Sequence, residues 1–262
     1  MDRAELDRLV HLNFAAFFAE TARFAEGGVA HDEGDILVWR TNTEWPVMTN
    51  GMIRVDDRVP GEVAVARARE FFTDCGFTAF SRDVETDADL AQALAATGWP
   101  RVIDMPEMVC PGPVDELQIP ADTTIRRVTD VDGVRDFAKM SSQAYATIGM
   151  PPEATAAAFS DAARALEPHL CAVLAYVDGV PVSGAMANLS HGIAGVYWVG
   201  TVAAARGRRL ADVCTRAVTN WAFDRGAQAV SLQASSQGEP IYRAMGYDEH
   251  FRYFGYVADR SG

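Results

Sequence analysis

The chain has 262 residues, of which 49% are hydrophobic and 23% charged, and its formal net charge at pH 7 is −13. This size and composition suit a globular protein with one large or two small domains. The acidic balance argues against general nucleic-acid binding, which requires a basic face. No run approaches the roughly 18 apolar residues of a membrane-spanning helix. The start MDRAELDRLV also lacks the basic and then apolar order of a secretory signal, so we expect a cytoplasmic protein with no membrane partner.

The first half of the chain alternates predicted strands with predicted helices. It opens with an amphipathic helix, in which Leu6, Val10, Phe14, Phe17 and Phe18 predict a stripe that faces the core. The elements expected after it are strands at 36–40, 46–48 and 52–55, a helix at 61–72, a strand at 77–81, a helix at 88–96 and a strand at 107–110.

A stretch rich in proline and glycine, from Cys110 to Pro113 with Ile119-Pro120 close behind, predicts a linker. We therefore expect two domains, residues 1–117 and residues 118–262. The elements expected in the second are a strand at 124–128, helices at 130–145 and 151–166, strands at 170–177, 180–189 and 193–202, a helix that carries Leu210 to Trp221, a strand at 229–234, a helix at 239–245 and a strand at 251–257.

The two halves share an order of elements, which suggests an internal duplication. Gly98-Trp99 and Gly246-Tyr247 lie 148 residues apart, and Gly61 and Gly207 lie 146 apart. The predicted fold class is therefore α/β (α+β), with two repeats that each form a mixed, mostly antiparallel twisted sheet flanked by helices. The second repeat carries the motifs described below, and the first is a degenerate copy.

The cysteines and histidines are scattered along the chain. No two of the four cysteines form a CxxC pair, and zinc ligands usually come in closely spaced pairs. We expect four buried thiols and no metal site. No GxSxG motif supports a hydrolase.

The segment from Arg206 to Ala211, RGRRLA, follows an apolar strand and opens an amphipathic helix. At such a position the unpaired backbone N–H groups and the helix dipole attract phosphate. The segment from Ser235 to Tyr247, SSQGEPIYRAMGY, follows the next strand and carries Tyr242 on a short helix.

Together these two motifs resemble the GNAT superfamily of acyl-CoA-dependent N-acetyltransferases. The resemblance covers residues 122–257 well and the first half only in the order of its elements. It implies a tandem GNAT protein with acetyl-CoA as co-substrate, and it assigns coenzyme binding to Val199, Gly200, Thr201, Arg206, Gly207, Arg208, Arg209, Leu210, Ala211 and Ser235. In the family, the strand segment Val199 to Thr201 pairs with the pantetheine arm and the turn binds the pyrophosphate.

The resemblance also implies that Tyr242 is the catalytic acid, because the family places a tyrosine there beside the coenzyme sulfur. A phenol with a pKa near 10 suits a thiolate of about 8.5 to 9.5. A backbone amide near Val199 or Gly200 would polarise the acetyl carbonyl. Where many relatives carry a glutamate as base, this chain has Tyr197 followed by Trp198, of which we expect only one to be functional. The base stays unassigned, with water, Glu153 or Asp161 as alternatives.

The main departure from the family pattern is Arg209, which stands where relatives have glycine. We expect coenzyme binding to survive it. The leading prediction is transfer of an acetyl group to a primary amine of a small or peptidyl acceptor. The first repeat is expected to form part of the wall of the acceptor site and to bind no coenzyme A. The alternative is a catalytically inert acyl-CoA-binding or structural GNAT-like protein. The acceptor and the oligomeric state are left open.

Overall fold

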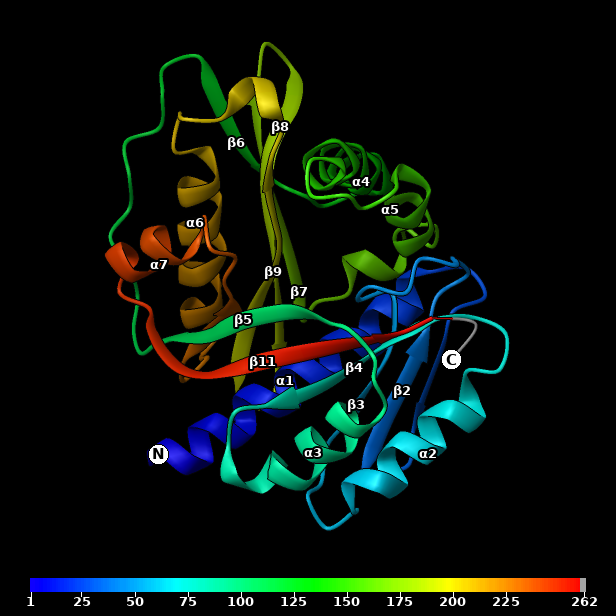
Figure 1. The fold of residues 1–262 in the computed structure, drawn as a ribbon. Coiled ribbons are helices and arrows are strands. Elements are labelled where there is room, and N and C mark those ends of the chain that lie inside the picture. Colours follow the sequence, from blue (N-terminus) through cyan, green and yellow to red (C-terminus); the bar gives the residue numbers. More distant parts are fainter. Residues whose placement is uncertain (260–262) are drawn as a thin grey trace.

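A computed structural model describes residues 1–259 and joins eleven strands into one continuous sheet (Figure 1). The strands of the first half are β1 (Val29–Asp32), β2 (Ile36–Arg40), β3 (Asn50–Arg54), β4 (Phe77–Arg82) and β5 (Arg101–Cys110). Those of the second half are β6 (Thr123–Arg127), β7 (Leu170–Val177), β8 (Val180–Ser190), β9 (Ile193–Thr201), β10 (Val230–Gln233) and β11 (Asp248–Ala258). The helices are α1 (Arg3–Phe24), α2 (Gly61–Phe71), α3 (Ala88–Ala96), α4 (Val131–Ala146), α5 (Pro152–Ala158), α6 (Leu210–Asp224) and α7 (Glu239–Met245).

The order of the strands is β1-β2-β3-β4-β11-β5-β10-β9-β8-β7-β6. Only two neighbouring pairs are parallel, β3 with β4 and β9 with β10, and they occupy equivalent positions in the two halves. The sheet is therefore mixed and mostly antiparallel, which confirms the predicted fold class.

The two halves exchange their last strands. β5 ends the first half but pairs with β10 of the second, and β11 ends the second half but pairs with β4 of the first. β5 and β11 also pair with each other at the centre of the sheet. The boundary between residues 117 and 118 stays a prediction, and the hydrogen-bonded sheet runs across it without a break.

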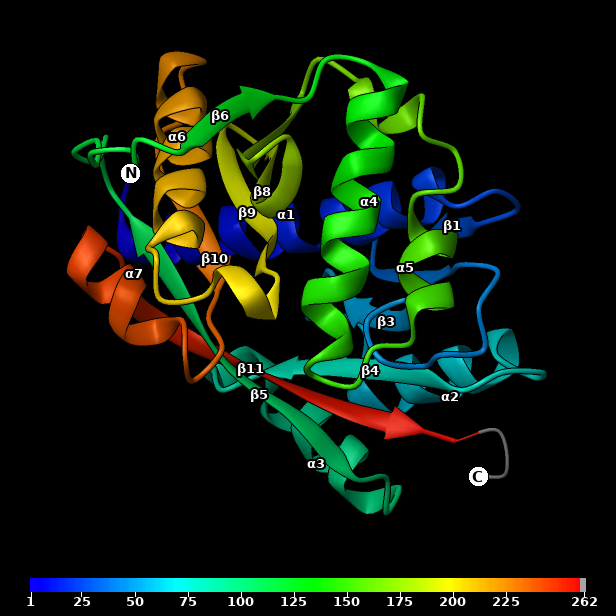
Figure 2. The same cartoon turned by 90° about the horizontal axis from the view of Figure 1, so that it is seen from above.

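Helices cover both faces of the sheet. In the second half, α6 and α7 lie on one face, and α4 and α5 lie on the other (Figures 1 and 2). The helix α1 packs on the same face as α4 and reaches both halves: Phe17 stacks on Tyr197 of β9 with ring centroids 3.5 Å apart, and Phe18 stacks on Trp39 of β2 at 3.9 Å. The predicted apolar stripe of α1 is therefore buried, apart from Leu6, which is half-buried.

Several element boundaries differ from those predicted. The helix expected at 151–166 ends at Ala158, because the next residues are tied to the end of α1: the Asp161 amide donates to the Phe24 carbonyl, and the Ser160 hydroxyl accepts from the Glu26 amide. The strand expected at 46–48 is absent from the described residues, and the exposed strand β1 was not predicted. Strand β5 begins at Arg101, six residues before its predicted start.

The glycines that suggested a duplication behave differently. Gly98 and Gly246 both adopt positive φ, 76° and 107°, at the ends of equivalent helices. Gly207 also has positive φ, whereas Gly61 is a helical residue that packs against α3. A side chain on Gly61 would lie 2.5 Å from the Leu90 Cα, so this glycine serves close helix packing.

Candidate functional site

The parallel pair β9 and β10 separates in the middle of the sheet. The last residues paired between them are Val196 and Leu232. Strand β9 then continues to Thr201 on β8, while β10 ends at Gln233. A bulge marks the separation, since the register shifts there and Trp198 has a φ of 53°. Residues Val199 to Thr201 therefore border an opening between β9 and β10, with backbone groups available on that side.

The turn before α6 leaves backbone donors near this opening. Gly207 has a φ of 77°, and a Cβ there would meet nothing within 4 Å. Within the described chain, no side chain caps the first residues of α6. An uncapped helix start with open space before it suits an anion.

The four arginines of this region each have a partner in the structure. Arg206 donates to the Thr147 hydroxyl at 2.6 Å, and Arg208 to the Asp122 carboxylate at 2.5 Å. Arg209 and Arg216 both bind the Asp212 carboxylate at 2.7 Å, and Arg216 also donates to the Asp115 carbonyl. The Arg209 guanidinium is thus held alongside the helix by a residue one turn on, while its backbone takes the left-handed φ of 60° that favours glycine.

Tyr242 of α7 lies on the α6 side of the opening. Burial raises the pKa of its phenol to about 12, and the nearby Asp212 carboxylate adds to the rise. Gly238 is required beside it, because a Cβ at Gly238 would lie 2.7 Å from the Tyr242 ring. The Ser235 hydroxyl accepts a hydrogen bond from the Gly238 amide, so Ser235 also shapes the turn that carries Tyr242.

A second tyrosine, which the sequence did not single out, approaches from the opposite face. Tyr145 of α4 donates a hydrogen bond to the Val199 carbonyl at 3.2 Å and packs against Trp198. Burial raises the pKa of Tyr145, and the proximity of Tyr242 adds to the rise. The two phenols therefore face the opening from its two sides. No motif marks Tyr145, because only the packing of α4 on β9 brings it here.

Tyr197 and Trp198 contact different elements on the same face of the sheet, because the bulge at Trp198 breaks the usual alternation of side chains. Tyr197 is buried beneath α1, where its hydroxyl donates to the Asn13 side chain at 2.8 Å. Trp198 packs between Tyr145 and Phe159, with ring centroids about 5 Å from each. Of the two residues, Trp198 is the one beside the opening.

In the first half, the corresponding region is filled by ion pairs. The fully buried Arg54 binds Asp89 with two hydrogen bonds of 2.9 and 3.0 Å, and Asp89 also accepts from the Gly61 amide at the start of α2. The Arg54 guanidinium holds the pKa of the Asp89 carboxyl at about 2. An internal carboxylate thus occupies the helix start where the second half leaves space. Asp56 and Asp57 lie on the preceding loop, and Asp56 pairs with Arg58.

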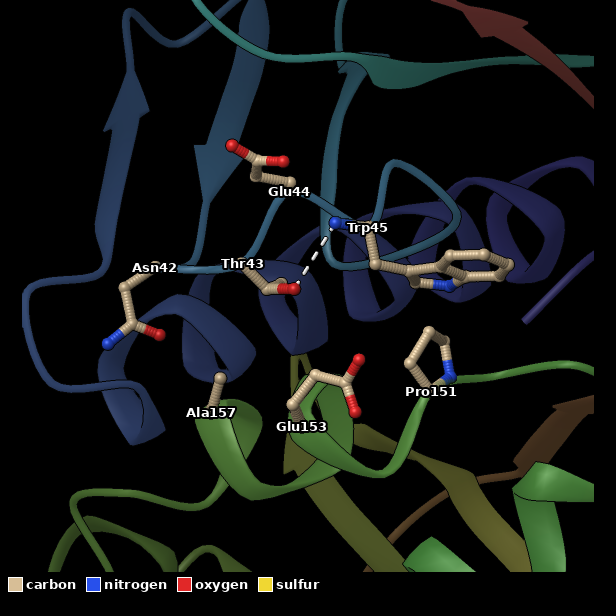
Figure 3. Close-up of a pocket in the computed structure, with 7 residues that line it drawn as sticks. All are labelled: Asn42, Thr43, Glu44, Trp45, Pro151, Glu153 and Ala157. Carbon is tan, nitrogen blue, oxygen red and sulfur yellow. Dashed lines mark hydrogen bonds between the residues drawn. The ribbon is translucent and has the colours of Figure 1, made fainter.

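A pocket of about 480 Å³ lies between the two halves (Figure 3). One wall is the loop after β2, and the other is α5. The lining residues are Asn42, Thr43, Glu44, Trp45, Pro151, Glu153 and Ala157. The Glu153 carboxylate extends toward the loop that carries Trp45, whereas the Glu44 carboxylate points away from α5 (Figure 3). The other candidate base, Asp161, pairs with Arg164 and lies outside this pocket.

All four cysteines are free and buried, as predicted. Among residues 1–259, no group of three acidic, histidine or cysteine side chains is arranged to hold a metal ion. In the same part of the chain, no helix is both long and apolar enough to span a bilayer.

Comparison with known proteins bears on this arrangement. The family model described as "Acetyltransferase (GNAT) domain" matches residues 118–253, more than half of the chain. The chain belongs to the GNAT acetyltransferase family. GNAT enzymes transfer acyl groups from acyl-CoA, so the protein is an acyltransferase by family. No curated protein matches the chain.

Solved GNAT structures share the whole fold. A GCN5-related N-acetyltransferase from Kribbella flavida has a TM-score of 0.69 at 22% identity, over 97% of this chain and 96% of its own. A GCN5-related N-acetyltransferase from Sphaerobacter thermophilus has a TM-score of 0.62 at 18% identity, over 87% and 83%. A tandem GNAT protein from the clavulanic acid biosynthesis pathway has a TM-score of 0.60 at 14% identity, over 96% and 87%. At these identities the likeness concerns the fold alone.

The residues of the second GNAT repeat fit a coenzyme A molecule. The empty space at Gly207 and the uncapped start of α6 suit a pyrophosphate, and the free side of β9 suits the amide groups of a pantetheine arm. In the first repeat, the Asp89 carboxylate takes the equivalent position, which disfavours an anion there.

Proposed function

We propose that the protein is an N-acetyltransferase that moves an acetyl group from acetyl-CoA to a primary amine, with its active site in the second repeat. The observation that carries the proposal is the opening between β9 and β10, which has an uncapped helix start on one face and a buried phenol beside it. This arrangement suits a long, phosphate-bearing thioester that runs from the surface into the sheet.

In this proposal the coenzyme pyrophosphate binds the backbone amides from Gly207 to Ala211. Arg206, Arg208 and Arg209 supply positive charge around it after exchanging their present partners for phosphate oxygens. The pantetheine arm pairs with Val199, Gly200 and Thr201, and Ser235 completes the far side of the opening. Acetyl-CoA supplies the acyl group as a thioester.

Tyr242 then acts as the acid for the leaving thiolate. The amine nitrogen attacks the acetyl carbon, the carbon–sulfur bond breaks, and the Tyr242 hydroxyl proton moves to sulfur. The proton lost by the nitrogen restores the phenol, so the enzyme is unchanged after one turnover. The pKa of about 12 is above that of a free thiol. The same burial would raise the pKa of a thiol beside Tyr242, which keeps donor and acceptor matched.

The acceptor approaches from the face that carries α4 and α5. The pocket between the two repeats opens on this side, and Glu153 and Trp45 offer it a carboxylate and an aromatic surface that suit a cationic amine. Removal of a proton from a lysine-like ammonium at pH 7 costs about 4.6 kcal/mol. A carboxylate near the entrance would help to lower this barrier, and Glu153 is the candidate that the pocket favours over Asp161.

The test is titration calorimetry with acetyl-CoA, followed by thiol release with a panel of primary amines. We expect binding, and turnover with at least one amine. Tyr242→Phe should lower kcat by about 10²- to 10⁴-fold without changing acetyl-CoA affinity, because it removes an acid and little else. Tyr176→Phe, which deletes the hydroxyl with which Tyr176 of β7 donates to Asp136 of α4, is the matched control and should keep full activity. Absence of heat with acetyl-CoA would contradict the proposal.

Two observations favour a second candidate, an inert protein that binds acyl-CoA or serves as a scaffold. Arg209 has a left-handed backbone conformation at the phosphate turn. Tyr197, a buried aromatic residue, stands at the position where relatives carry a glutamate. Acetyl-CoA binding without turnover across the whole amine panel would support this candidate.

A further inference from the structure

A carboxyl group is buried at the centre of the sheet, and the proposed reaction does not use it. Glu107 of β5 has no exposed surface. Its Oε2 accepts a hydrogen bond from the Gln233 side-chain amide at 2.6 Å, while Oε1 has no partner within residues 1–259. A buried carboxyl whose hydrogen-bonding neighbours are a glutamine amide and a serine hydroxyl is costly for stability, so a structural role alone accounts for it poorly.

Glu107 and Gln233 lie at the point where the sheet opens. Glu107 faces Gln233 in the antiparallel register of β5 and β10. Gln233 is the first residue of β10 beyond the last pair with β9, Val196 and Leu232. The two side chains therefore form one row at the closed end of the opening.

Their side chains share the α1 side of the sheet. Glu107 lies two residues before Val109 and Gln233 four residues after Ala229, so each pair of side chains is on the same face of its strand. Val109 and Ala229 both pack in the core under α1. The proposed acceptor approaches from this same face. Gln233 is half-buried, so one end of its amide is fixed inside by Glu107 while the side chain still reaches accessible space.

The groups around Glu107 are acidic or neutral. Asp7 of α1, Tyr197 of β9 and Tyr253 of β11 interact with it electrostatically, and the Ser231 hydroxyl of β10 lies within reach of its carboxyl group and favours the charged form. Burial, with a further contribution from Asp7, raises the pKa of Glu107 to about 8. The carboxyl is therefore mostly protonated at pH 7, and an amide of the same shape can replace it without loss of charge.

We propose that Gln233 binds the nitrogen of the acceptor amine and that Glu107 is its positioning residue. Because the Gln233 NH₂ group is engaged by Glu107, the Gln233 carbonyl oxygen is the free end of the amide and accepts an N–H of the amine. A primary amine can donate this hydrogen and still present its lone pair to the acetyl carbon. The first repeat thereby contributes to the active site of the second through the exchanged strand β5. The inference rests on the proposed acetyltransferase function.

The test measures the KM for the best amine of the panel and the acetyl-CoA affinity in three variants. Gln233→Met removes the acceptor oxygen, and Glu107→Gln leaves the orientation of the Gln233 amide unspecified. Each should raise the amine KM about 10-fold, as for the loss of one hydrogen bond, with acetyl-CoA affinity unchanged. The double substitution of Glu107→Gln with Gln233→Glu rebuilds the pair with exchanged groups and should recover most of the affinity for the amine.

The control is Glu20→Gln, which makes the same change in α1 at a carboxylate that pairs with Arg23. It should leave both constants unchanged. Thermal unfolding of every variant checks that the fold is intact. Wild-type turnover with an amine KM that neither single substitution alters would overturn the inference while the proposed function stands. Acetyl-CoA binding without any wild-type turnover would overturn both.

Discussion

Arg209 affects stability in two opposite ways: its backbone conformation is strained, and its side chain forms an ion pair. A non-glycine residue in the left-handed region costs about 1 kcal/mol or more, whereas the ion pair of the exposed Arg209 with the buried Asp212, which is also paired with Arg216, contributes about 0–1 kcal/mol. Arg209→Gly should therefore raise the free energy of unfolding by up to about 1 kcal/mol. Arg209→Ala loses the ion pair and keeps the strain, so it should be less stable than the wild type. Chemical denaturation of both variants measures this, and equal stabilities for Gly and Ala would refute the strain.

The candidate site was predictable where one short segment carries the chemistry. The turn from Arg206 to Ala211 and the helix with Tyr242 are local motifs, so each can be recognised from one continuous stretch of the sequence. Glu107 and Gln233 meet across 126 residues of sequence, and Tyr145 meets Val199 across 54. Such pairs depend on strand exchange and helix packing, which no local pattern encodes.

Among the elements, the pair α2 and α3 of the first repeat shows why a motif glycine can mislead. Gly61 matches Gly207 in sequence offset, yet its role is contact with the backbone of α3. Gly61→Ala should lower the free energy of unfolding by about 1–3 kcal/mol, because the clash is with main-chain atoms that cannot rotate away. Its counterpart is Gly98→Ala, where a Cβ meets nothing within 4 Å and only the positive φ opposes it. Thermal melts that rank Gly98→Ala as the more damaging would contradict this assignment.

Most elements followed from apolar periodicity, since their lengths are set by the residues that face the core. The exceptions depend on contacts between elements. Helix α5 stops at Ala158 because the Phe24 carbonyl at the end of α1 accepts the Asp161 amide, and β1 forms from exposed residues because it pairs with β2. The extra length of β5, residues 101–106, comes from its pairing with β11, which lies more than 100 residues later in the chain.

For the molecule as a whole, the exchanged strands predict that the repeats are not independent. Residues 1–117 produced alone lack β11 and expose the edge of β4, and residues 118–262 lack β5 and expose the edge of β10. Each half alone should be unfolded or aggregated, whereas the two produced together should associate into a folded complex. Circular dichroism and size-exclusion chromatography distinguish these states. A separate half that folds as a soluble monomer would show that the exchange is dispensable.

The central position of β11 also has a consequence for synthesis on the ribosome. Its residues 248–258 are translated after β1 to β10, yet they fill the gap between β4 and β5. A first half that has already left the exit tunnel keeps two unpaired sheet edges until β11 has been translated. Unpaired edges of this kind invite pairing with other chains. The interval before β11 emerges is therefore the period in which a nascent chain of this protein most needs protection by chaperones.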